Sequence, residues 1–485
     1  MPWKLSSAGR ASVLQTEGRR FESRSFHSPI GRKTEKMITI KIPKQVNEIL
    51  DTLHNSGYEA YIVGGCVRDA ALGRSPHDWD ITTSAEPDEV KTLFERTIDT
   101  GLKHGTVTVM SGKTGYEVTT FRVDGDYSDG RHPDSVAFTK DLIKDLERRD
   151  FTINAMAYTK ESGLIDPFDG YGDIGRGIIR AVGDPKQRFS EDALRIMRAF
   201  RFSAQLGYDI DPDTLEAAEK LAPNLKMVSA ERIRSELEKI LVSDNPDVLE
   251  PAWETGITRQ FLPEFDRCME TEQNNPYHWY TVGEHILKSM RFVRNDRVLR
   301  LTMLLHDIGK PECLTTDKKG IDHFYGHAEK SCAMAEEILR RLKYDNDTIG
   351  KVLHLIEWHD ENFRMTKAGI RRAVAEVGRD MFPLLLEVKR ADAMAQSDYK
   401  KEEKLETLWT LRETYRSIIK NGDCLTLKDL AVNGDDIIAC GIKPGKEVGR
   451  ILKKMLDDVI NVPEHNDRDY LIRHYVKRRS REETR

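Results

Sequence analysis

Residues 60–69 read AYIVGGCVRD, and DWD follows at residues 78–80. The apolar run from Ala60 to Val63 predicts a short buried strand, after which two glycines turn the chain into a helix. Glycines at a helix start let backbone N–H groups approach a phosphate, and Arg68 adds positive charge one turn later. The stretch therefore predicts a strand-to-helix turn that can hold an anion.

Asp78 and Asp80 form the second half of this pattern. Residues i and i+2 of a strand point to the same side, so the two carboxylates should lie together. Two like charges this close are unfavourable unless a cation lies between them, and Mg²⁺ prefers carboxylate and phosphate oxygens. A DxD pair or a Gly-Gly turn alone is usually structural. Together, at this spacing, they predict a metal–triphosphate site.

Four more motifs follow along the chain. They are Arg148-Arg149-Asp150-Phe151-Thr152-Ile153-Asn154-Ala155, Asp166-Pro167-Phe168-Asp169-Gly170, Glu191-Asp192-Ala193-Leu194-Arg195 with Arg198 and Arg201, and Ser229-Ala230-Glu231-Arg232-Ile233 with Glu236. With the Gly-Gly and DxD motif, this ordered set resembles the class II CCA-adding tRNA nucleotidyltransferases of the nucleotidyltransferase/poly(A) polymerase family. The resemblance covers roughly residues 60–240.

The resemblance implies that a tRNA 3′-hydroxyl attacks the α-phosphate of CTP or ATP and that pyrophosphate leaves. Asp78 and Asp80 would be catalytic and would hold Mg²⁺, and Glu117 matches a third acidic position. Glu117 could also be an ordinary outward-facing strand residue. The nucleotide-binding residues implied are Gly64, Gly65, Arg68, Arg149, Asp150 and Asn154.

Asp192 and Arg195 are three residues apart in a predicted helix and should share one face. Alone, this spacing is typical of a surface ion pair. It also fits a base edge, because a carboxylate accepts from the amino group of cytosine or adenine while arginine donates to ring acceptors. Uracil and guanine present a carbonyl where that amino group lies. We expect this pair to select C and A, with Arg198 and Arg201 near triphosphate or tRNA.

Within the same family, the segment from Asp124 to Pro133 lies where a flexible loop helps the switch from C to A addition. The motif Asp124-Gly125-x-Tyr127-x-Asp129-x-Arg131-His132-Pro133 favours full CCA addition or A addition over CC addition.

A second constellation of histidines and aspartates lies in the later half of the chain. An adjacent His306-Asp307 pair inside an apolar predicted helix, Leu301 to Ile308, needs partners because burial of such a pair is costly. Mixed nitrogen and oxygen ligands suit a divalent metal. The pattern resembles the HD phosphohydrolase superfamily, which implies a transition-metal site and trimming of RNA ends. The candidate ligands are His285, His306, Asp307 and Asp392, and also His327 and His359. The alternative is a structural body that only supports tRNA.

Composition excludes several classes of protein. The 485 residues are 39% hydrophobic and 32% charged, which suits a soluble, helix-rich chain, and no apolar run reaches the ~18–20 residues of a membrane span. The net charge of −5 argues against an overall basic nucleic-acid coat but leaves local patches open. The six cysteines form no CxxC pair, so we expect free thiols and a cytoplasmic location.

The predicted fold is α+β, with a small mixed-sheet nucleotidyltransferase head before an all-α neck, an HD-type helical body and a helical tail. The predicted boundaries are 37–175 for the head, 176–250 for the nucleotide- and RNA-binding neck, 251–400 for the HD-type body and 401–485 for the tRNA-binding tail. Residues 440–485 contain twelve Lys/Arg and eight Asp/Glu, a local excess of positive charge that suits an RNA backbone.

Residues 1–36 differ from the rest, being rich in Arg and Ser without apolar periodicity. We interpret them as a non-native or disordered extension, with Met37 as the true start. A transit peptide is the alternative, although Glu17, Glu22 and Glu35 argue against it.

The leading hypothesis is template-independent addition of C, C and A to tRNA from CTP and ATP, together with HD-domain end trimming. The first alternative is a poly(A) polymerase, against which the motif at residues 191–195 and the attached histidine–aspartate body speak. The second alternative is an HD phosphohydrolase acting on RNA ends, against which the intact Asp78/Asp80 pair speaks.

Overall fold

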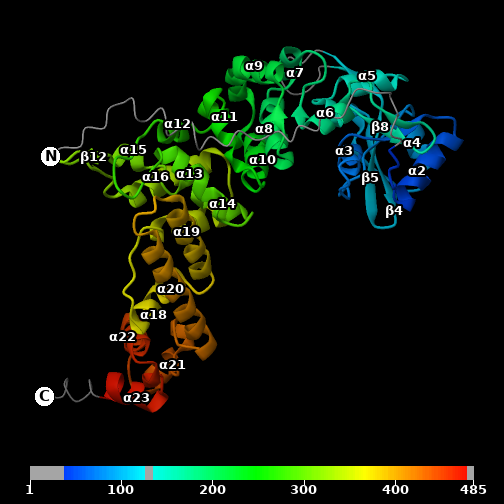
Figure 1. Cartoon of the computed structure of the whole chain (residues 1–485). Coiled ribbons are helices and arrows are strands. Elements are labelled where there is room, and N and C mark those ends of the chain that lie inside the picture. The colour runs from blue at the N-terminus through cyan, green and yellow to red at the C-terminus, as the bar shows by residue number, and fades with distance from the viewer. Residues whose placement is uncertain (1–37, 126–134, 478–485) are drawn as a thin grey trace. The chain divides into compact units, whose positions relative to one another are not determined.

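The structure is a computed structural model that describes residues 38–125 and 135–477. The interpretation of residues 1–36 lies outside the described residues, as do residues 126–134 of the predicted switching loop and residues 478–485 of the basic tail. In Figure 1 the strands of the head carry the blue and cyan colours, and from α7 onward nearly every labelled element is a helix. The predicted α+β class, with a mixed sheet followed by helices, is confirmed.

The head is built on one seven-stranded sheet in the order β3-β4-β5-β2-β1-β8-β9. Its strands are β1 Ala60–Val63, β2 Ile81–Thr83, β3 Thr97–Gly101, β4 Thr106–Ser111, β5 Thr114–Thr120, β8 Ala157–Thr159 and β9 Gly163–Ile165. Neighbouring strands are antiparallel except β2 and β5, which run parallel. The helices of the head are α2 Lys44–Asn55, α3 Gly65–Ala71, α4 Pro87–Leu93, α5 Leu142–Glu147 and α6 Gly170–Arg176.

The apolar positions of the sequence explain these elements. Val46, Ile49, Leu50 and Leu53 recur at helical spacing and form the buried side of α2. The strand predicted at residues 60–63 is present as β1. From Tyr116 to Val123 the extended chain is divided between two strands.

Phe121 causes that division. Its side chain is fully buried and its N–H donates to the Thr83 carbonyl at 2.7 Å, which holds the chain against the end of β2. The next residues form β6 Arg122–Asp124, which leaves the large sheet and pairs with β7 Val136–Phe138. Local propensity does not reveal this break, because a tertiary contact produces it.

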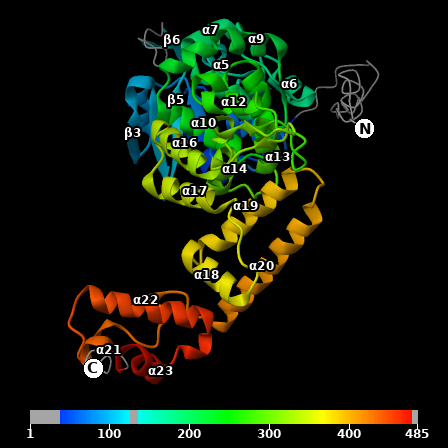
Figure 2. The same ribbon diagram turned by 90° about the vertical axis from the view of Figure 1, so that its left-hand side faces the viewer.

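The chain after the head is helical apart from two-residue strands. Its longer helices are α7 Pro185–Glu191, α8 Leu194–Leu206, α9 Pro212–Leu221, α10 Ala230–Leu241, α12 Pro263–Met269, α13 Val282–Met290, α14 Arg297–Leu305, α16 His327–Arg341, α17 Asn346–Trp358, α18 Lys367–Val377, α19 Met381–Ala395, α20 Lys401–Asn421 and α22 Lys446–Asn461. The shorter helices are α11 Leu249–Glu254, α15 Lys310–Cys313, α21 Gly434–Ala439 and α23 Arg468–Ile472. Figure 2 shows α19 and α20 running beside each other, with α18 next to them.

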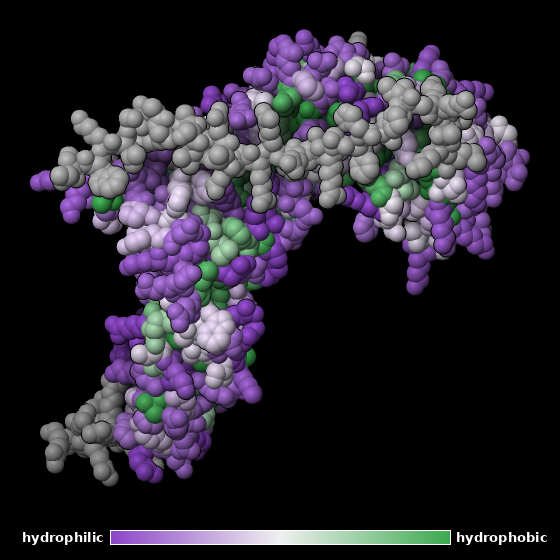
Figure 3. All heavy atoms as spheres, in the orientation of Figure 1, coloured by the Kyte–Doolittle hydropathy of each residue, from purple (hydrophilic) through white to green (hydrophobic). Residues whose placement is uncertain are grey.

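The C-terminal helices have a core of their own. Val448, Ile451, Met455 and Val459 of α22 are buried at helical spacing against Leu471 of α23. The surface that Figure 3 shows is mainly hydrophilic across the described residues, as the 32% of charged residues leads one to expect.

Candidate functional site

The turn between β1 and α3 places backbone N–H groups at one end of the sheet. Gly64 has a φ of 78°, a backbone conformation that residues with a Cβ rarely adopt, and precedes the first residue of α3. A Cβ at this position would lie 2.9 Å from Nη1 of Arg149. The glycine therefore serves two purposes: it makes the turn, and it lets Arg149 lie against it.

The acidic residues meet beside this turn. Asp78 lies in a bend and Asp80 directly precedes β2, so neither is within a strand as predicted, although the Val63 N–H still donates to the Asp80 carbonyl at 3.0 Å. Ile81 of β2 pairs with Val118 of β5, which aligns Asp80 with Glu117 on the neighbouring strand. Because Ile81 and Val118 point into the core, their neighbours Asp80 and Glu117 face the other side.

The electrostatics agree with this placement. Burial raises the pKa of Asp80 above its ordinary value; Arg149 lowers it, whereas the carboxylates of Glu117 and Asp78 raise it further. All three acidic side chains are solvent-accessible. These carboxylates repel one another and are accessible to solvent, so a divalent cation bound between them would relieve the repulsion. Because all the donor atoms are carboxylate oxygens, the site suits Mg²⁺.

A network of polar side chains connects the turn to helix α8. Arg68 Nη1 donates to Oδ1 of Asn154 at 2.7 Å, and Nδ2 of Asn154 donates to Oδ1 of Asp150 at 3.1 Å. Arg198 Nε donates to the other Asp150 oxygen at 2.7 Å. Burial opposes a charge on Asp150, but Arg198 and Asn154 outweigh it and hold the pKa of that carboxyl well below its usual value.

Three arginines surround one aromatic ring, that of Phe202 in α8. The guanidinium carbons of Arg68, Arg198 and Arg201 lie 5.0, 5.5 and 3.7 Å from the ring centroid. Arg201 also forms an ion pair of 2.5 Å with Glu236 of α10. The sequence motifs do not predict Phe202 as part of the site. Nothing in its sequence context distinguishes it from an ordinary core residue.

Arg149 completes the basic side of the site. Its Nη2 lies 3.6 Å from Oδ2 of the buried Asp145, while its Nε is buried without a hydrogen-bond partner among the described residues. An unpaired buried N–H is costly, and a bound anion would satisfy it.

The predicted Asp192–Arg195 pair has a different geometry from the one expected. Asp192 is not helical: it lies between α7 and α8, where its Oδ1 accepts from the Leu194 N–H at 3.0 Å, as a capping aspartate does. Both of its oxygens are held by Arg232 of α10, at 3.2 and 2.7 Å. Sequence reasoning missed this bidentate contact, although the predicted motif at residues 229–233 contains Arg232.

Arg195 is anchored separately. Its guanidinium donates to Glu191 at 2.5 Å and to the carbonyls of Arg188 and Arg148 at 3.0 Å each. The two predicted base-reading side chains thus lie in the same region, and each is fixed by its own partners.

The histidine–aspartate candidates come from several helices and their ends. His285 lies within α13 and Asp392 within α19, whereas His306 and His359 follow the last residues of α14 and α17. His327 is the first residue of α16. The predicted helix through His306 and Asp307 therefore ends earlier, at Leu305.

These side chains meet in two groups that share Asp307. In the first group, His285 Nε2 lies 2.9 Å from Oδ1 of Asp392 and 3.3 Å from Nε2 of His306. In the second, the Nε2 atoms of His327 and His359 are 3.3 Å apart. The structure thus brings together all six predicted side chains.

The orientation of three imidazoles suits metal binding. The Nδ1 atoms of His306, His327 and His359 lie 2.8, 3.0 and 2.6 Å from backbone carbonyls. A carbonyl only accepts, so Nδ1 carries the hydrogen and Nε2 faces the cluster, as in histidines that ligate metals. Burial opposes a charge on His306, but the Asp307 carboxylate outweighs it and raises the pKa of that ring to about 10.

The ammonium group of Lys310 offsets part of the negative charge of this cluster. Its Nζ lies 2.6 Å from Oδ2 of Asp307. The predicted set of six side chains does not place it at the cluster. Its position i+3 from Asp307 is the signal that could have done so.

No helix in residues 38–125 and 135–477 is both long and apolar enough to cross a bilayer.

Comparison with known proteins assigns most of the chain. Residues 60–180 match the family described as Poly A polymerase head domain, residues 207–269 match the probable RNA and SrmB-binding site of polymerase A, and residues 314–474 match tRNA nucleotidyltransferase domain 2 (putative).

Full-length relatives agree with these matches. The CCA-adding enzyme of Levilactobacillus brevis is 36% identical over 438 residues, which is 87% of this chain and 95% of that protein. The Leuconostoc mesenteroides CCA-adding enzyme is 56% identical over 194 residues, 40% of this chain, and there the chain spans about half of the relative (48%). The crystal structure of the Bacillus stearothermophilus CCA-adding enzyme in complex with CTP superposes with a TM-score of 0.69 at 31% identity, over 92% of this chain and 100% of that one.

Proposed function

Because the chain belongs to the family of CCA-adding tRNA nucleotidyltransferases, we propose that it adds C, C and A to the 3′ end of tRNA, using CTP and ATP. One observation carries this proposal: the carboxylates of Asp78, Asp80 and Glu117 converge beside the Gly64–Gly65 turn, with arginines around it.

In the proposed reaction, the tRNA 3′-hydroxyl oxygen forms a bond to the α-phosphorus of the nucleotide. The bond from that phosphorus to the bridging oxygen of the β-phosphate breaks, pyrophosphate leaves, and the hydroxyl proton passes to solvent. Mg²⁺, when bound, supplies positive charge that offsets the charge developing on the phosphate. Asp78, Asp80 and Glu117 are proposed to hold it.

The remaining predicted residues would position the triphosphate. The backbone N–H of Gly65 is proposed to donate to a phosphate oxygen, as helix N-termini commonly do. The Gly64 N–H already donates to the Met156 carbonyl at 3.1 Å, so Gly64 is proposed to contribute through the turn that it makes. Arg68 and Arg149 would add charge beside them. Asp150 and Asn154 are proposed to hold the two arginines in place. Asn154 accepts from Arg68, Asp150 accepts from Arg198, and Asn154 donates to Asp150.

Nucleotide choice is proposed to rest on Asp192 and Arg195. Asp192 would accept from the amino group of cytosine or adenine, and Arg232 would fix the direction of its oxygens. Arg195 would donate to ring acceptors through the N–H groups that its contacts to Glu191 and the two carbonyls leave over. Uracil and guanine would bring a carbonyl oxygen against the carboxylate.

The experiment that tests the proposal uses Mg²⁺ and a tRNA transcript lacking its 3′ CCA, with CTP and ATP given separately and together. Addition of two C residues from CTP alone, and of a terminal A only when both are present, is the expected result. A long tail from ATP alone would instead assign a poly(A) polymerase.

The domain boundaries at residues 175, 250 and 400 stay proposals, as does tRNA binding by the tail. The proposed location is the cytoplasm, which the six free cysteine thiols favour.

A second candidate activity is metal-dependent hydrolysis of phosphate esters at RNA ends. The two groups that share Asp307 favour this activity, because together they bring four histidine Nε2 atoms close to the carboxylates of Asp307 and Asp392. His285, His306, Asp307 and Asp392 are proposed to hold one divalent transition-metal ion, with His327 and His359 as further ligands. Such an ion, when bound, supplies Lewis acidity at the phosphate.

In that reaction, water forms a bond to phosphorus, the bond to the ribose oxygen breaks, and phosphate and a free hydroxyl are released. Incubation of the full chain with a 3′-phosphorylated RNA and Mn²⁺ or Ni²⁺ should release inorganic phosphate. Neither bound metal nor released phosphate with any of several ions would overturn this second proposal.

A further inference from the structure

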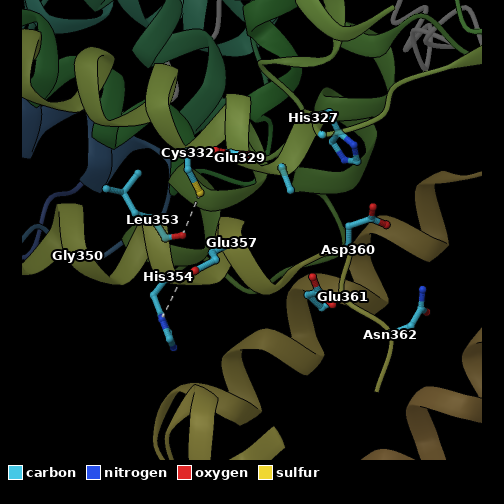
Figure 4. Close-up of a pocket in the computed structure, with 12 residues that line it drawn as sticks. His327, Glu329, Cys332, Gly350, Leu353, His354, Glu357, Asp360, Glu361 and Asn362 are labelled. Atoms are coloured by element: carbon cyan, nitrogen blue, oxygen red, sulfur yellow. Dashed lines mark hydrogen bonds and ion pairs between the residues drawn. The ribbon is translucent and has the colours of Figure 1, made fainter. Parts of the chain in front are cut away.

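One buried carboxylate of the head takes no part in the proposed reaction. It belongs to Asp145 of α5, whose side chain is 0% exposed. The acidic side chains around the cavity beside His327, which Figure 4 shows, are all exposed instead: Glu329, Glu357, Asp360 and Glu361. Water compensates their charges, whereas a buried carboxylate needs partners from the protein.

Each oxygen of Asp145 has partners of its own. Oδ1 accepts from Nη2 and Nε of Arg148, at 2.7 and 3.0 Å, and from the Arg122 N–H at 3.3 Å. Oδ2 accepts from the Thr82 hydroxyl at 3.1 Å and lies 3.6 Å from Nη2 of Arg149. Burial opposes a charge on Asp145, but Arg148 and Arg149 outweigh it and hold the pKa of that carboxyl below its usual value. Asp145 is therefore an anion in the folded head.

The position of Asp145 connects it to the candidate nucleotidyl-transfer site. Arg148 and Arg149 follow it at i+3 and i+4, at the end of α5, and this spacing brings all three together. Thr82 follows Asp80 by two residues, so their side chains lie on the same side of the extended chain. Arg149 interacts electrostatically with both carboxylates, that of Asp145 and that of Asp80.

Arg149 is attracted by carboxylates on two sides. Asp145 is its one ion-pair partner among the described residues. On the other side lie the three carboxylates proposed to hold Mg²⁺, and none of them forms an ion pair within the described part of the chain. Asp150, a further carboxylate near Arg149, is already paired with Arg198. An Arg149 released by Asp145 would therefore move toward Asp80 and compete there with Mg²⁺.

We propose that Asp145 is a positioning residue: its carboxylate keeps Arg149 at the Gly64 turn and away from the carboxylates that would hold Mg²⁺. Nη1 of Arg149 already lies at that turn, 2.9 Å from the place of a Cβ on residue 64. There its buried Nε, which has no partner among the described residues, can donate to a phosphate. The inference rests on the proposed nucleotidyl transfer and deepens it, because it names the residue that keeps the cation and nucleotide sites apart.

The substitution Asp145→Asn alters mainly the side that faces Arg149. The amide oxygen can keep the contacts of Oδ1 with Arg148, while the amide nitrogen takes the place of Oδ2. Thr82 accommodates this change, since its hydroxyl can accept from the amide and donate to the Thr119 carbonyl 3.2 Å away. Nη2 of Arg149 cannot accommodate it, because one donor would then face another.

The test compares the wild-type full chain with Asp145→Asn and with the matched control Asp173→Asn. Asp173 is equally buried in the same head, accepts from the Thr152 hydroxyl and pairs with Arg176 at i+3. Titration calorimetry in EDTA measures CTP binding without metal. Single-turnover C addition to tRNA is measured over a range of Mg²⁺ concentrations. Thermal denaturation should show a lower Tm in both variants, so loss of stability alone cannot separate them.

In Asp145→Asn, metal-free CTP binding should weaken by about 10-fold to 100-fold, the loss expected for a charge-assisted contact to phosphate. Half-maximal C addition should need about 10-fold more Mg²⁺, and excess Mg²⁺ should restore the rate, because Mg²⁺ and the guanidinium compete for the same carboxylates. Asp173→Asn should change neither value. If Asp145→Asn behaves like wild type, or if both variants change alike, the inference is overturned while the nucleotidyl transfer stands. A wild-type chain that neither binds CTP nor adds C would overturn both.

A second pair of variants decides the question even if Asp145→Asn does not fold alone. In Arg149→Gln the competing guanidinium is absent, so the double variant Asp145→Asn/Arg149→Gln should need no more Mg²⁺ than Arg149→Gln. A further rise of the Mg²⁺ requirement in the double variant would show that Asp145 acts through another group, and would overturn the inference.

Discussion

Asp80 is the residue on which the proposed nucleotidyl transfer should depend most directly. It stands between Asp78, two residues before it, and Glu117, its neighbour across the parallel pair of strands. Its raised pKa reflects burial and these two carboxylates. A side chain that is crowded by like charges and still accessible has little structural use, so its replacement should affect catalysis far more than stability.

We expect Asp80→Asn to lower kcat for C addition by at least about 100-fold, the usual effect of removing one preorganised electrostatic group. The measurement is single-turnover addition of one C residue from CTP to tRNA. Asp51→Asn, which changes an exposed carboxylate of α2, is the control and should be neutral. Asp80→Asn with more than a tenth of wild-type activity would refute the assignment.

Asp192 and Arg232 give a prediction on selectivity. Asp192→Ala should reduce the ratio of kcat/KM for CTP over UTP by about 100-fold or more, because a carbonyl is no longer repelled. Arg232→Ala should reduce it less, since the carboxylate remains but loses its bidentate support. Arg234→Ala, on the same helix but in contact with Lys343 and Tyr344, should leave the ratio unchanged. Unaltered discrimination in Asp192→Ala would move the choice of base to other residues.

At the scale of elements, the β1–α3 turn illustrates how backbone and side chain depend on each other. The turn needs a positive φ at Gly64, and the absence of a Cβ there also gives Arg149 its place. Gly57 allows the effect of backbone strain to be separated from the effect of displacing Arg149. It has a similar φ of 86°, but a Cβ added there would have no neighbouring atom within 4 Å.

Gly64→Ala and Gly57→Ala should each lower the free energy of unfolding by about 1–3 kcal/mol, the cost of a sparsely populated positive-φ conformation for a residue with a Cβ. Thermal denaturation measures this. Only Gly64→Ala should also raise KM for CTP, because its methyl group moves Arg149. Equal KM values in the two variants would show that Arg149 does not contact the nucleotide.

Sequence reasoning succeeds where the information is local. The strand Ala60–Val63 and the Gly-Gly helix start are predictable because apolar burial and turn chemistry are contained in ten residues. The break at Phe121 and the position of Asp192 between two helices depend on tertiary contacts and are not. The six histidine and aspartate positions follow from the resemblance to the HD phosphohydrolase superfamily, whereas the contact of Lys310 with Asp307 requires the fold.

At the scale of the whole molecule, two candidate centres occupy different parts of the sequence. Asp78, Asp80 and Glu117 belong to the head, and the cluster around Asp307 belongs to the helices after it. The two centres share no residue. Their activities should therefore be separable by mutation.

Asp392→Asn should abolish phosphate release and lower bound transition metal while C addition to tRNA stays near the wild-type rate. Asp78→Asn should abolish C addition to tRNA while phosphate release and bound transition metal stay near the wild-type values. In the wild-type chain, removal of metal by EDTA should lower Tm, because an ion at 100 times its Kd stabilises the folded state by about 2.7 kcal/mol. Metal content by mass spectrometry accompanies each assay. Loss of both activities in Asp392→Asn would show that the centres are not independent.

The order of strands in the head sheet also determines how the protein must be made. Strand β1 is central, with β2 on one side and β8 on the other, yet β8 ends at Thr159, 39 residues after β5 ends at Thr120. At 5–20 residues per second, a ribosome needs about 2–8 s to cover that distance. During this interval Ile62 and Val63 of the nascent chain form an unpaired strand edge, to which another chain can pair until β8 has been made.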